Sequence, residues 1–394
     1  MFMISLYNYI STTNPEHVLN EKEREILLKL DKEYGKFFKE FWFKWDRTDC
    51  KNLMEEWEKF KKTRENKEKY YPQIKLVIDD LTPSFLEWGN KLILKFQSFP
   101  CFLSKYYIEN INYMMNQAIG TIYKTKESFA ILNKQMCPKV SEENYKLAMK
   151  MLKEYPYKDV REDQPWRGPD IQKMMQDHID KCGFHYKVEL NPYMIARQNV
   201  VPHEPVLHIR TKGRFSDIDV ASLKIHEVEV HVARRHWGFQ TGLNLFVDGL
   251  IERNTLDEGM AINQSLHHNP KGIKPNLEFD IAIKTVIGYH IMEKDFIELY
   301  DWLSKKLKTE DNKDIIELVV FKNLMRFKRV IQDCSLLGGD AISETDYFCG
   351  YQLVKDMPDY LKEDIIKWNI GPSQIKDLPD IKMFFSKNKF KPLN

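Results

Sequence analysis

The segment HEVEVH at residues 226–231, together with a later carboxylate at Glu258, has the composition of a hydrolytic metal site. Such a site holds zinc through two imidazoles and one carboxylate, and it keeps a fourth position open for water. A glutamate beside one ligand then serves as the general base. The sequence therefore predicts one zinc ion per chain, held by His226, His231 and Glu258, with Glu227 activating the zinc-bound water.

The spacing of the two histidines is unusual, because they lie five residues apart and not four. In a straight α-helix this separation corresponds to about 500° of rotation and leaves the side chains roughly 140° apart. A π-bulge adds one residue to a turn and restores their convergence, and such bulges are frequent at functional sites. A zinc site therefore requires a different winding around Val228–Val230. Without it, the histidines lie on different faces of a structural helix.

Other polar residues near the motif are candidates for supporting roles. Glu229 is the weaker candidate for the base, because it falls on another side of the helix. Asp257 either supports one of the histidines or is an exposed helix acid. Arg234 is placed to brace a carboxylate. The pair His267-His268 is disfavoured as further ligands, because three ligands are already in place.

The elements that must position these residues are mostly helical. Alternating apolar residues predict short strands at 184–190 and 206–210, and the second strand is a candidate edge for a peptide substrate to join. Ser216 and Asp219 form a capping box at the start of the helix that carries HEVEVH. Apolar periodicity and capping signals predict further helices at 16–66, 84–100, 102–134, 141–152, 169–181, 256–267, 276–307, 312–332 and 343–356.

Together these elements predict an α+β fold that is mostly helical, in the layout of a metallopeptidase with a small β-sheet. A connection rich in proline, glycine and tryptophan follows the helix at 141–152, and that helix is taken as the start of the catalytic part. Residues 1–139 then form a helical N-terminal region that serves as a lid, a partner surface or a dimer contact. Residues 140–394 form the catalytic domain.

The composition disfavours several other classes of protein. The formal net charge is only +2 and lysines alternate with acids, so no basic patch indicates nucleic acid. No stretch reaches the roughly 18 consecutive apolar residues of a membrane span. The six cysteines show no regular spacing, and the first residues lack the pattern of a signal peptide. A reducing cytoplasm is the expected location, and the oligomeric state stays open.

Several motifs between residues 140 and 360 resemble those of a known family. TLDEGMA at 255–261 stands where the family has EEGLA or QEGLA. RFKR at 326–329 and YFCG at 347–350 are similar to its basic RxxR stretch and its late Tyr-Leu-x-Gly element. With the HEVEVH segment, this series resembles the bacterial QEGLA-motif proteins and their eukaryotic relatives, the microtubule-associated tyrosine carboxypeptidases.

This resemblance implies a zinc metallopeptidase, and a carboxypeptidase in particular, with the ligands given above and a peptide or protein C-terminal tail as substrate. A planar guanidinium binds a terminal carboxylate bidentately, so Arg326 and Arg329 are the candidates for that contact, with Lys328 as a point charge. Tyr347 either donates to the oxyanion of the tetrahedral intermediate or belongs to the core.

The chain departs from the family pattern near the expected substrate pocket. Val330 replaces a glycine, the segment 341–344 (AISE) replaces FTKD, and His236-Trp237 replaces a smaller polar pair. These changes leave the metal chemistry untouched and the preference for tyrosine open. The alternative function is a non-catalytic regulatory or structural protein whose fold is stabilised by zinc. Chelation would then lower the melting temperature while no peptide is cut.

Overall fold

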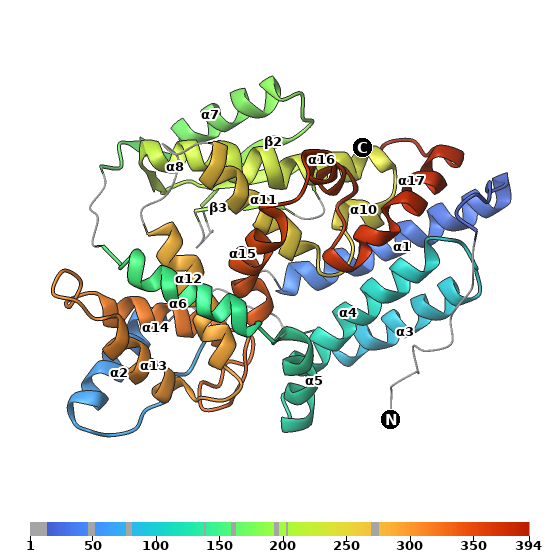
Figure 1. The fold of residues 1–394 in the computed structure, drawn as a ribbon. Helices are drawn as coiled ribbons and strands as arrows, with labels where there is room; N and C mark the ends of the chain where they lie inside the picture. Colours follow the sequence, from blue (N-terminus) through green and yellow to red (C-terminus); the bar gives the residue numbers. More distant parts are fainter. Residues whose placement is uncertain are drawn as a thin grey trace.

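The computed structural model describes residues 14–45, 52–75, 81–137, 139–158, 163–192, 197–201, 204–268 and 276–393. Over these residues the chain is mostly helical with two small sheets, which confirms the predicted α+β class. Figure 1 shows α11 (Arg253–His268) and α15 (Ala341–Val354) near the centre of the molecule. None of the helices within these ranges is long and apolar enough to cross a membrane.

The N-terminal helices follow the predicted apolar periodicity, with two divisions. The helix expected over 16–66 contains α1 and α2, and residues 46–51 between them lie outside the described residues. The helix expected over 102–134 divides at Lys124, whose left-handed conformation (φ 49°) ends α4. The helices of this part are α1 (Glu21–Trp45), α2 (Leu53–Glu65), α3 (Pro83–Gln97), α4 (Ser104–Tyr123), α5 (Lys126–Met136) and α6 (Glu142–Glu154).

The larger sheet has three short strands in the order β2-β4-β3. β4 (Val206–Arg210) is parallel to β2 (Lys187–Asn191) and antiparallel to β3 (Gln198–Val200). The expectation that the strand at 206–210 offers a free edge is therefore wrong, because β4 is paired on both sides. A two-stranded antiparallel sheet joins β1 (Trp166–Arg167) to β5 (Arg214–Phe215).

Among the described residues, the remaining helices include one division and three α-helices beyond the predicted set, at 244–248, 359–368 and 378–387. The helix expected over 276–307 divides at residues 291–295, where Asp295 caps α13 through the amide of Glu298. The predicted helices end before α16 and α17. The bounds are α7 (Gly168–Lys181), α8 (Asp217–Ser222), the π-helix η2 (Leu223–Val232), α9 (Ala233–Thr241), α10 (Asn244–Asp248), α12 (Leu277–His290), α13 (Phe296–Leu307), α14 (Ile316–Lys328), α16 (Asp359–Trp368), the 3-10 helix η4 (Pro372–Asp377) and α17 (Leu378–Lys387).

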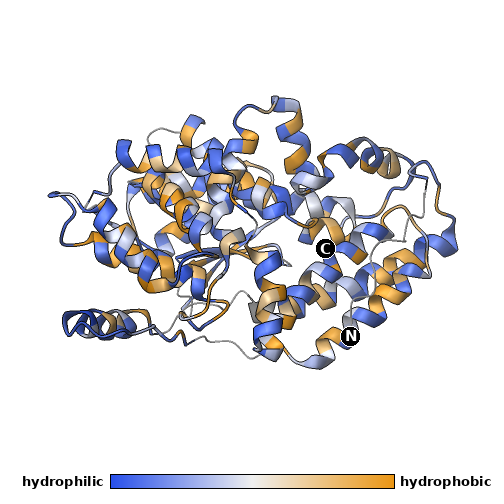
Figure 2. Ribbon diagram, turned by 60° about the horizontal axis from the view of Figure 1, so that its bottom comes forward, coloured by the Kyte–Doolittle hydropathy of each residue, from blue (hydrophilic) through white to orange (hydrophobic). Residues whose placement is uncertain are grey.

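The hydrophobic core contains residues from both sides of the boundary expected near residue 139. One buried cluster combines Tyr107 of α4 with Phe246 of α10 and Met260 of α11. Another brings Phe60 of α2 against Phe321 of α14, with ring centroids 5.3 Å apart. Figure 2 shows hydrophobic residues, in orange, along helix faces that turn toward neighbouring helices. The N-terminal helices therefore share their core with the part of the chain that carries HEVEVH.

Candidate metal centre and active site

The helix that carries HEVEVH is wound as a π-helix. The predicted capping box is present: the Ser216 hydroxyl accepts from the amide of Asp219 at 3.1 Å, and the Asp219 carboxylate accepts from the amide of Ser216 at 3.0 Å. After α8, the π winding extends over the ten residues of η2, and not over a single turn. Because this winding brings residues five apart onto one face, the rings of His226 and His231 lie 4.9 Å apart. The predicted change of winding is confirmed.

Glu258 of α11 completes a group of three candidate ligands. Its Oε2 atom lies 3.4 Å from Nε2 of His226 and 3.8 Å from Nε2 of His231, and one ligand atom of each residue lies within 4.8 Å of the others. Ligands arranged tetrahedrally about 2.0–2.1 Å from zinc are roughly 3.3 Å apart, so small movements would let these atoms share one ion. Oε2 of Glu258 is buried without a hydrogen-bond partner among the described residues, which fits an atom whose partner is a metal.

Asp257 lies against the other ring nitrogen of His231. Its Oδ1 atom is 2.9 Å from Nδ1 of His231, and Nε of the buried Arg234 is 3.3 Å from the same oxygen. Burial alone would lower the pKa of His231, but the charges of Asp257 and Glu258 outweigh it and raise this pKa to about 10. Of the two interpretations of Asp257, the exposed helix acid is wrong, because this side chain is buried and contacts one of the two histidines. Arg234 braces the Asp257 carboxylate, as predicted. Because Asp257 contacts Nδ1 of His231, the other ring nitrogen, Nε2, faces Glu258.

Glu227 lies next to His226 on η2 and is partly buried. Nε2 of Gln198, from β3, donates to Oε1 of Glu227 at 3.3 Å. The charge of Glu227 contributes to raising the pKa of both His231 and Tyr347, so the carboxylate lies within electrostatic reach of a ligand and of α15. A hydrogen bond from a neutral amide orients the carboxylate and leaves its negative charge in place.

Two further candidates contact residues outside this group. The Glu229 carboxylate lies 3.0 Å from Nε2 of His178 in α7, and its side chain is 43% exposed. His267, in the last turn of α11, has its Nε2 atom 3.3 Å from the hydroxyl of Tyr351. The ligand group found within the described residues contains neither Glu229 nor His267.

Two roles were considered for Tyr347 of α15 from the sequence: a hydrogen-bond donor to the oxyanion, and a residue of the core. Its partly buried side chain packs against the core around α12 and α14, and the ammonium of Lys284 lies 4.3 Å from the centre of its ring. The negative charge of Glu258, followed by burial, raises the pKa of the Tyr347 hydroxyl well above its usual value. The hydroxyl therefore keeps its proton at neutral pH and can donate a hydrogen bond near the ligand group.

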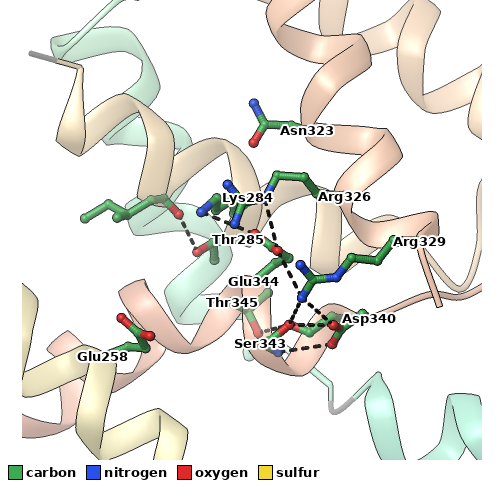
Figure 3. Close-up of polar contacts among 12 residues, drawn as sticks. Glu258, Lys284, Thr285, Asn323, Arg326, Arg329, Asp340, Ser343, Glu344 and Thr345 are labelled. Atoms are coloured by element: carbon green, nitrogen blue, oxygen red, sulfur yellow. Dashed lines mark hydrogen bonds and ion pairs between the residues drawn. The ribbon is translucent and has the colours of Figure 1, made fainter. Parts of the chain in front are cut away.

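Figure 3 shows a cluster of charged side chains around Glu344, between α12, α14 and α15 and across from Glu258. Nζ of Lys284 lies 3.2 Å from Oε2 of Glu344, and Nε of Arg326 donates to Oε1 at 3.1 Å. Arg329 lies 3.7 Å from the same carboxylate. Burial alone would raise the pKa of Glu344, but the three neighbouring cations outweigh it and lower this pKa to about 2. Glu344 therefore stays ionised and holds the three cations together.

The two arginines of this cluster differ in how many hydrogen bonds their guanidinium groups make and in how exposed they are. Arg329 donates to Asp340 at 3.0 Å and to Ser343 at 3.1 Å, and its side chain is 25% exposed. Arg326 is 49% exposed and donates to Glu344 through Nε, and no hydrogen bond from its terminal nitrogens is found among the described residues. With Lys284 of α12, three cations lie against the carboxylates of Glu344 and Asp340.

Lys328, also considered for substrate binding, has a fully buried side chain. Its ammonium donates to the carbonyl of Gly338 at 2.8 Å and to the carbonyl of Leu336. Burial lowers the pKa of this lysine to about 8. Because the ammonium is bonded to the loop before α15, we do not include Lys328 among the proposed substrate contacts.

Three polar residues of the site were not among the predicted ones. Lys284 is the single lysine of an otherwise apolar stretch of α12, and a buried charge of this kind is a signal that sequence reasoning can use. Glu344 keeps an acidic residue at the last position of the segment that replaces FTKD, which was also a usable signal. Gln198 has no comparable signal, because a glutamine in a three-residue strand carries no recognisable pattern.

Comparison with protein families agrees with the motifs. Residues 122–314 match the family model described as microtubule-associated tyrosine carboxypeptidase, which confirms the family identified from the sequence. The matched residues include the three candidate ligands and Glu227, and they end before Arg326 and Tyr347. A search of curated proteins found no match to the chain.

Proposed function

Because residues 122–314 belong to the microtubule-associated tyrosine carboxypeptidase family, we propose that the protein is a zinc-dependent carboxypeptidase that removes the C-terminal residue of a peptide or protein. The observation that supports this most directly is the convergence of His226, His231 and Glu258 beside Glu227. Family membership implies the hydrolysis of a terminal peptide bond, and the donor set is one that catalytic zinc sites use.

The three converging residues would hold the metal. His226 and His231 supply imidazole nitrogens, Glu258 supplies a carboxylate oxygen, and Asp257 supports His231 from its second nitrogen. A bound zinc ion lowers the pKa of a coordinated water to about 7 and polarises the scissile carbonyl. Because the pKa of His231 is about 10 without metal, this imidazole must release a proton before it can act as a ligand.

Glu227 and Tyr347 would handle the proton and the developing charge. The Glu227 carboxylate, oriented by Gln198, takes a proton from the attacking water and returns it to the nitrogen of the departing amino acid. The Tyr347 hydroxyl stays protonated beside Glu258 and donates to the carbonyl oxygen as negative charge develops on it.

Arg326 would bind the terminal carboxylate of the substrate. Its Nε atom is bonded to Glu344, and its terminal nitrogens can form the paired hydrogen bonds that a carboxylate accepts. An amidated C-terminus has no negative charge to pair with this guanidinium, so a free C-terminus is favoured over an amidated one. Arg329 holds this arrangement in place through Asp340 and Ser343.

The family name indicates the terminal residue and the partner. It points to tyrosine as the residue removed and to microtubules as the binding partner, which would place the protein in the cytoplasm. Val330 and the segment 341–344 differ from the family pattern close to the charged cluster, so they are the positions that would change the preferred residue. Peptides that differ only in their last residue measure this preference.

Replacement of Glu227 by glutamine tests the proposed function. The variant keeps the size and polarity of the side chain but cannot accept a proton, so kcat should fall by about 10²–10⁴-fold while bound zinc is unchanged. Glu229→Gln, on the same helix, is the matched control and should retain activity. His226→Ala and Glu258→Ala should each lose the metal, measured by mass spectrometry on protein purified without added zinc.

Two results would decide against this proposal. Full peptidase activity in Glu227→Gln with zinc still bound would show that another residue is the base. The second result is bound zinc without cleavage of any peptide or of the C-terminal tails of microtubules, together with a lower melting temperature on chelation. It would identify a non-catalytic protein whose fold is stabilised by zinc.

A further inference from the structure

The two edges of the three-stranded sheet differ in how they are covered. On the outer edge of β2, Gln176 of α7 accepts from the amide of Val188 at 2.9 Å, and Gln172 donates to the carbonyl of the same residue at 2.9 Å. Gln176 also donates to the carbonyl of Tyr186 at 3.0 Å. These two side chains therefore replace a neighbouring strand, which is one way in which proteins block an exposed sheet edge.

The edge formed by β3 has no such cover among the described residues. The amide of Val201 donates to Val206, and the amide of Arg210 donates to Arg197, each at 2.9 Å. Main-chain groups of alternate residues face opposite sides of a strand, so those of Gln198 and Val200 point away from β4. This edge presents N–H and C=O groups in the spacing that an added strand requires.

The side chains of β3 lie against the proposed catalytic helix. The side chain of Gln198 reaches Glu227 at 3.3 Å, and Val200 is buried in the same cluster as Val228 and Val232 of η2. A peptide main chain paired with β3 would therefore run beside the carboxylate that is proposed to act on it. The opposite edge, at β2, is covered by α7.

We propose that β3 binds the main chain of the peptide substrate by strand addition, through the outward N–H and C=O groups of Gln198 and Val200. This inference rests on the proposed function and adds a subsite upstream of the bond that is cut. Main-chain pairing is independent of side-chain identity, so it would hold tails of varied sequence in one extended conformation. Binding of the terminal carboxylate would remain with Arg326.

The test uses zinc-loaded protein and a series of fluorescent peptides ending in tyrosine, in which one main-chain amide at a time is replaced by an ester. An ester removes one donor and leaves the side chain unchanged. Because only alternate residues of an added strand face β3, esters at every second position should weaken binding about three- to tenfold, and those between them should not. Binding is followed by anisotropy on Glu227→Gln, and KM is measured on the unmodified enzyme.

Val200→Pro supplies the corresponding change in the protein. Proline removes the outward N–H and is tolerated on an edge strand, whereas Val200→Ala loses the side chain and keeps the N–H. We expect only the proline variant to weaken binding of the parent peptide and to abolish the alternation, with melting temperature confirming that both fold. Uniform ester effects, or equal binding by the two variants, would overturn the inference. Alternating binding without any cleavage would instead overturn the proposed function alone.

Discussion

Gly350 of α15 lies directly against Gly259 of α11, with no room for a side chain between the two helices. A Cβ atom on Gly350 would lie 3.0 Å from Cα of Gly259 and 1.8 Å from the carbonyl oxygen of Thr255. Gly259 belongs to the motif that supplies Glu258, and Gly350 belongs to the motif that supplies Tyr347. The two glycines therefore explain how motifs distant in sequence place a candidate ligand and a candidate donor beside each other.

Gly350→Ala should weaken both the fold and catalysis. The added methyl group must push α15 away from α11, and overpacking of this kind costs about 1–3 kcal/mol of unfolding free energy. The same shift moves Tyr347 relative to Glu258, so kcat should fall by about tenfold or more. Urea unfolding and peptide hydrolysis measure the two effects. Leu353→Ala, at an exposed position of the same helix, is the control; equal stability in both variants would refute the close packing.

Asp257→Asn should lower the affinity for zinc without removing a ligand. The carboxylate lies 2.9 Å from Nδ1 of His231, and loss of such a supporting contact typically costs 10–100-fold in metal affinity. Competition with a chromophoric chelator measures the dissociation constant. Asp359→Asn, at a residue 94% exposed in its side chain, should leave it unchanged. Unaltered affinity in Asp257→Asn would mean that the contact with His231 does not tune the site.

Much of the candidate metal centre could be predicted, because its chemistry depends on residue types and spacing. The five-residue separation of His226 and His231 required a π-wound helix if both were to bind one ion, and the structure has that winding. The capping box at Ser216 could be recognised because it involves residues only three positions apart. Such features are local, so periodicity and capping rules reach them.

The cluster around Glu344 could not be predicted in the same way. Lys284, Arg326 and Glu344 come from three helices, and only tertiary packing brings them together. The short strand β3 was missed because three residues are too few to show alternation, and the pairing of β4 was misjudged as a result. The turn within the helix expected over 276–307 was also missed, because the apolar periodicity continues on both sides of it.

Lysine substitutions should show that Arg326 binds the substrate and that Arg329 stabilises the fold. Arg326→Lys keeps the charge but loses the paired hydrogen bonds, so KM for a free C-terminus should rise about tenfold or more with little change in melting temperature. Arg329→Lys should lower the melting temperature, because it loses the bonds to Asp340 and Ser343. C-terminally amidated peptides should be insensitive to Arg326→Lys. Equal effects on both peptide types would exclude a carboxylate contact.

Glu344→Gln should destabilise the fold in a pH-dependent manner. Neighbouring cations lower the pKa of the buried Glu344 to about 2, against about 4.3 in an unfolded chain. A carboxyl group with a depressed pKa stabilises the fold fully above the unfolded value, and this contribution disappears as the pH falls through the folded value. The difference corresponds to on the order of 3 kcal/mol, present above about pH 4.5 and lost between about pH 4.5 and 2.

Urea unfolding at several pH values between 7 and 2 measures this difference between the two proteins. The unfolding free energies should be far apart at pH 7, where the variant leaves Lys284, Arg326 and Arg329 without their shared carboxylate. They should converge as the wild-type carboxyl group takes up its proton. Glu310→Gln, at a residue 93% exposed in its side chain, should follow the wild type throughout. A separation that stays constant with pH would mean that lost packing, and not lost charge, destabilises Glu344→Gln.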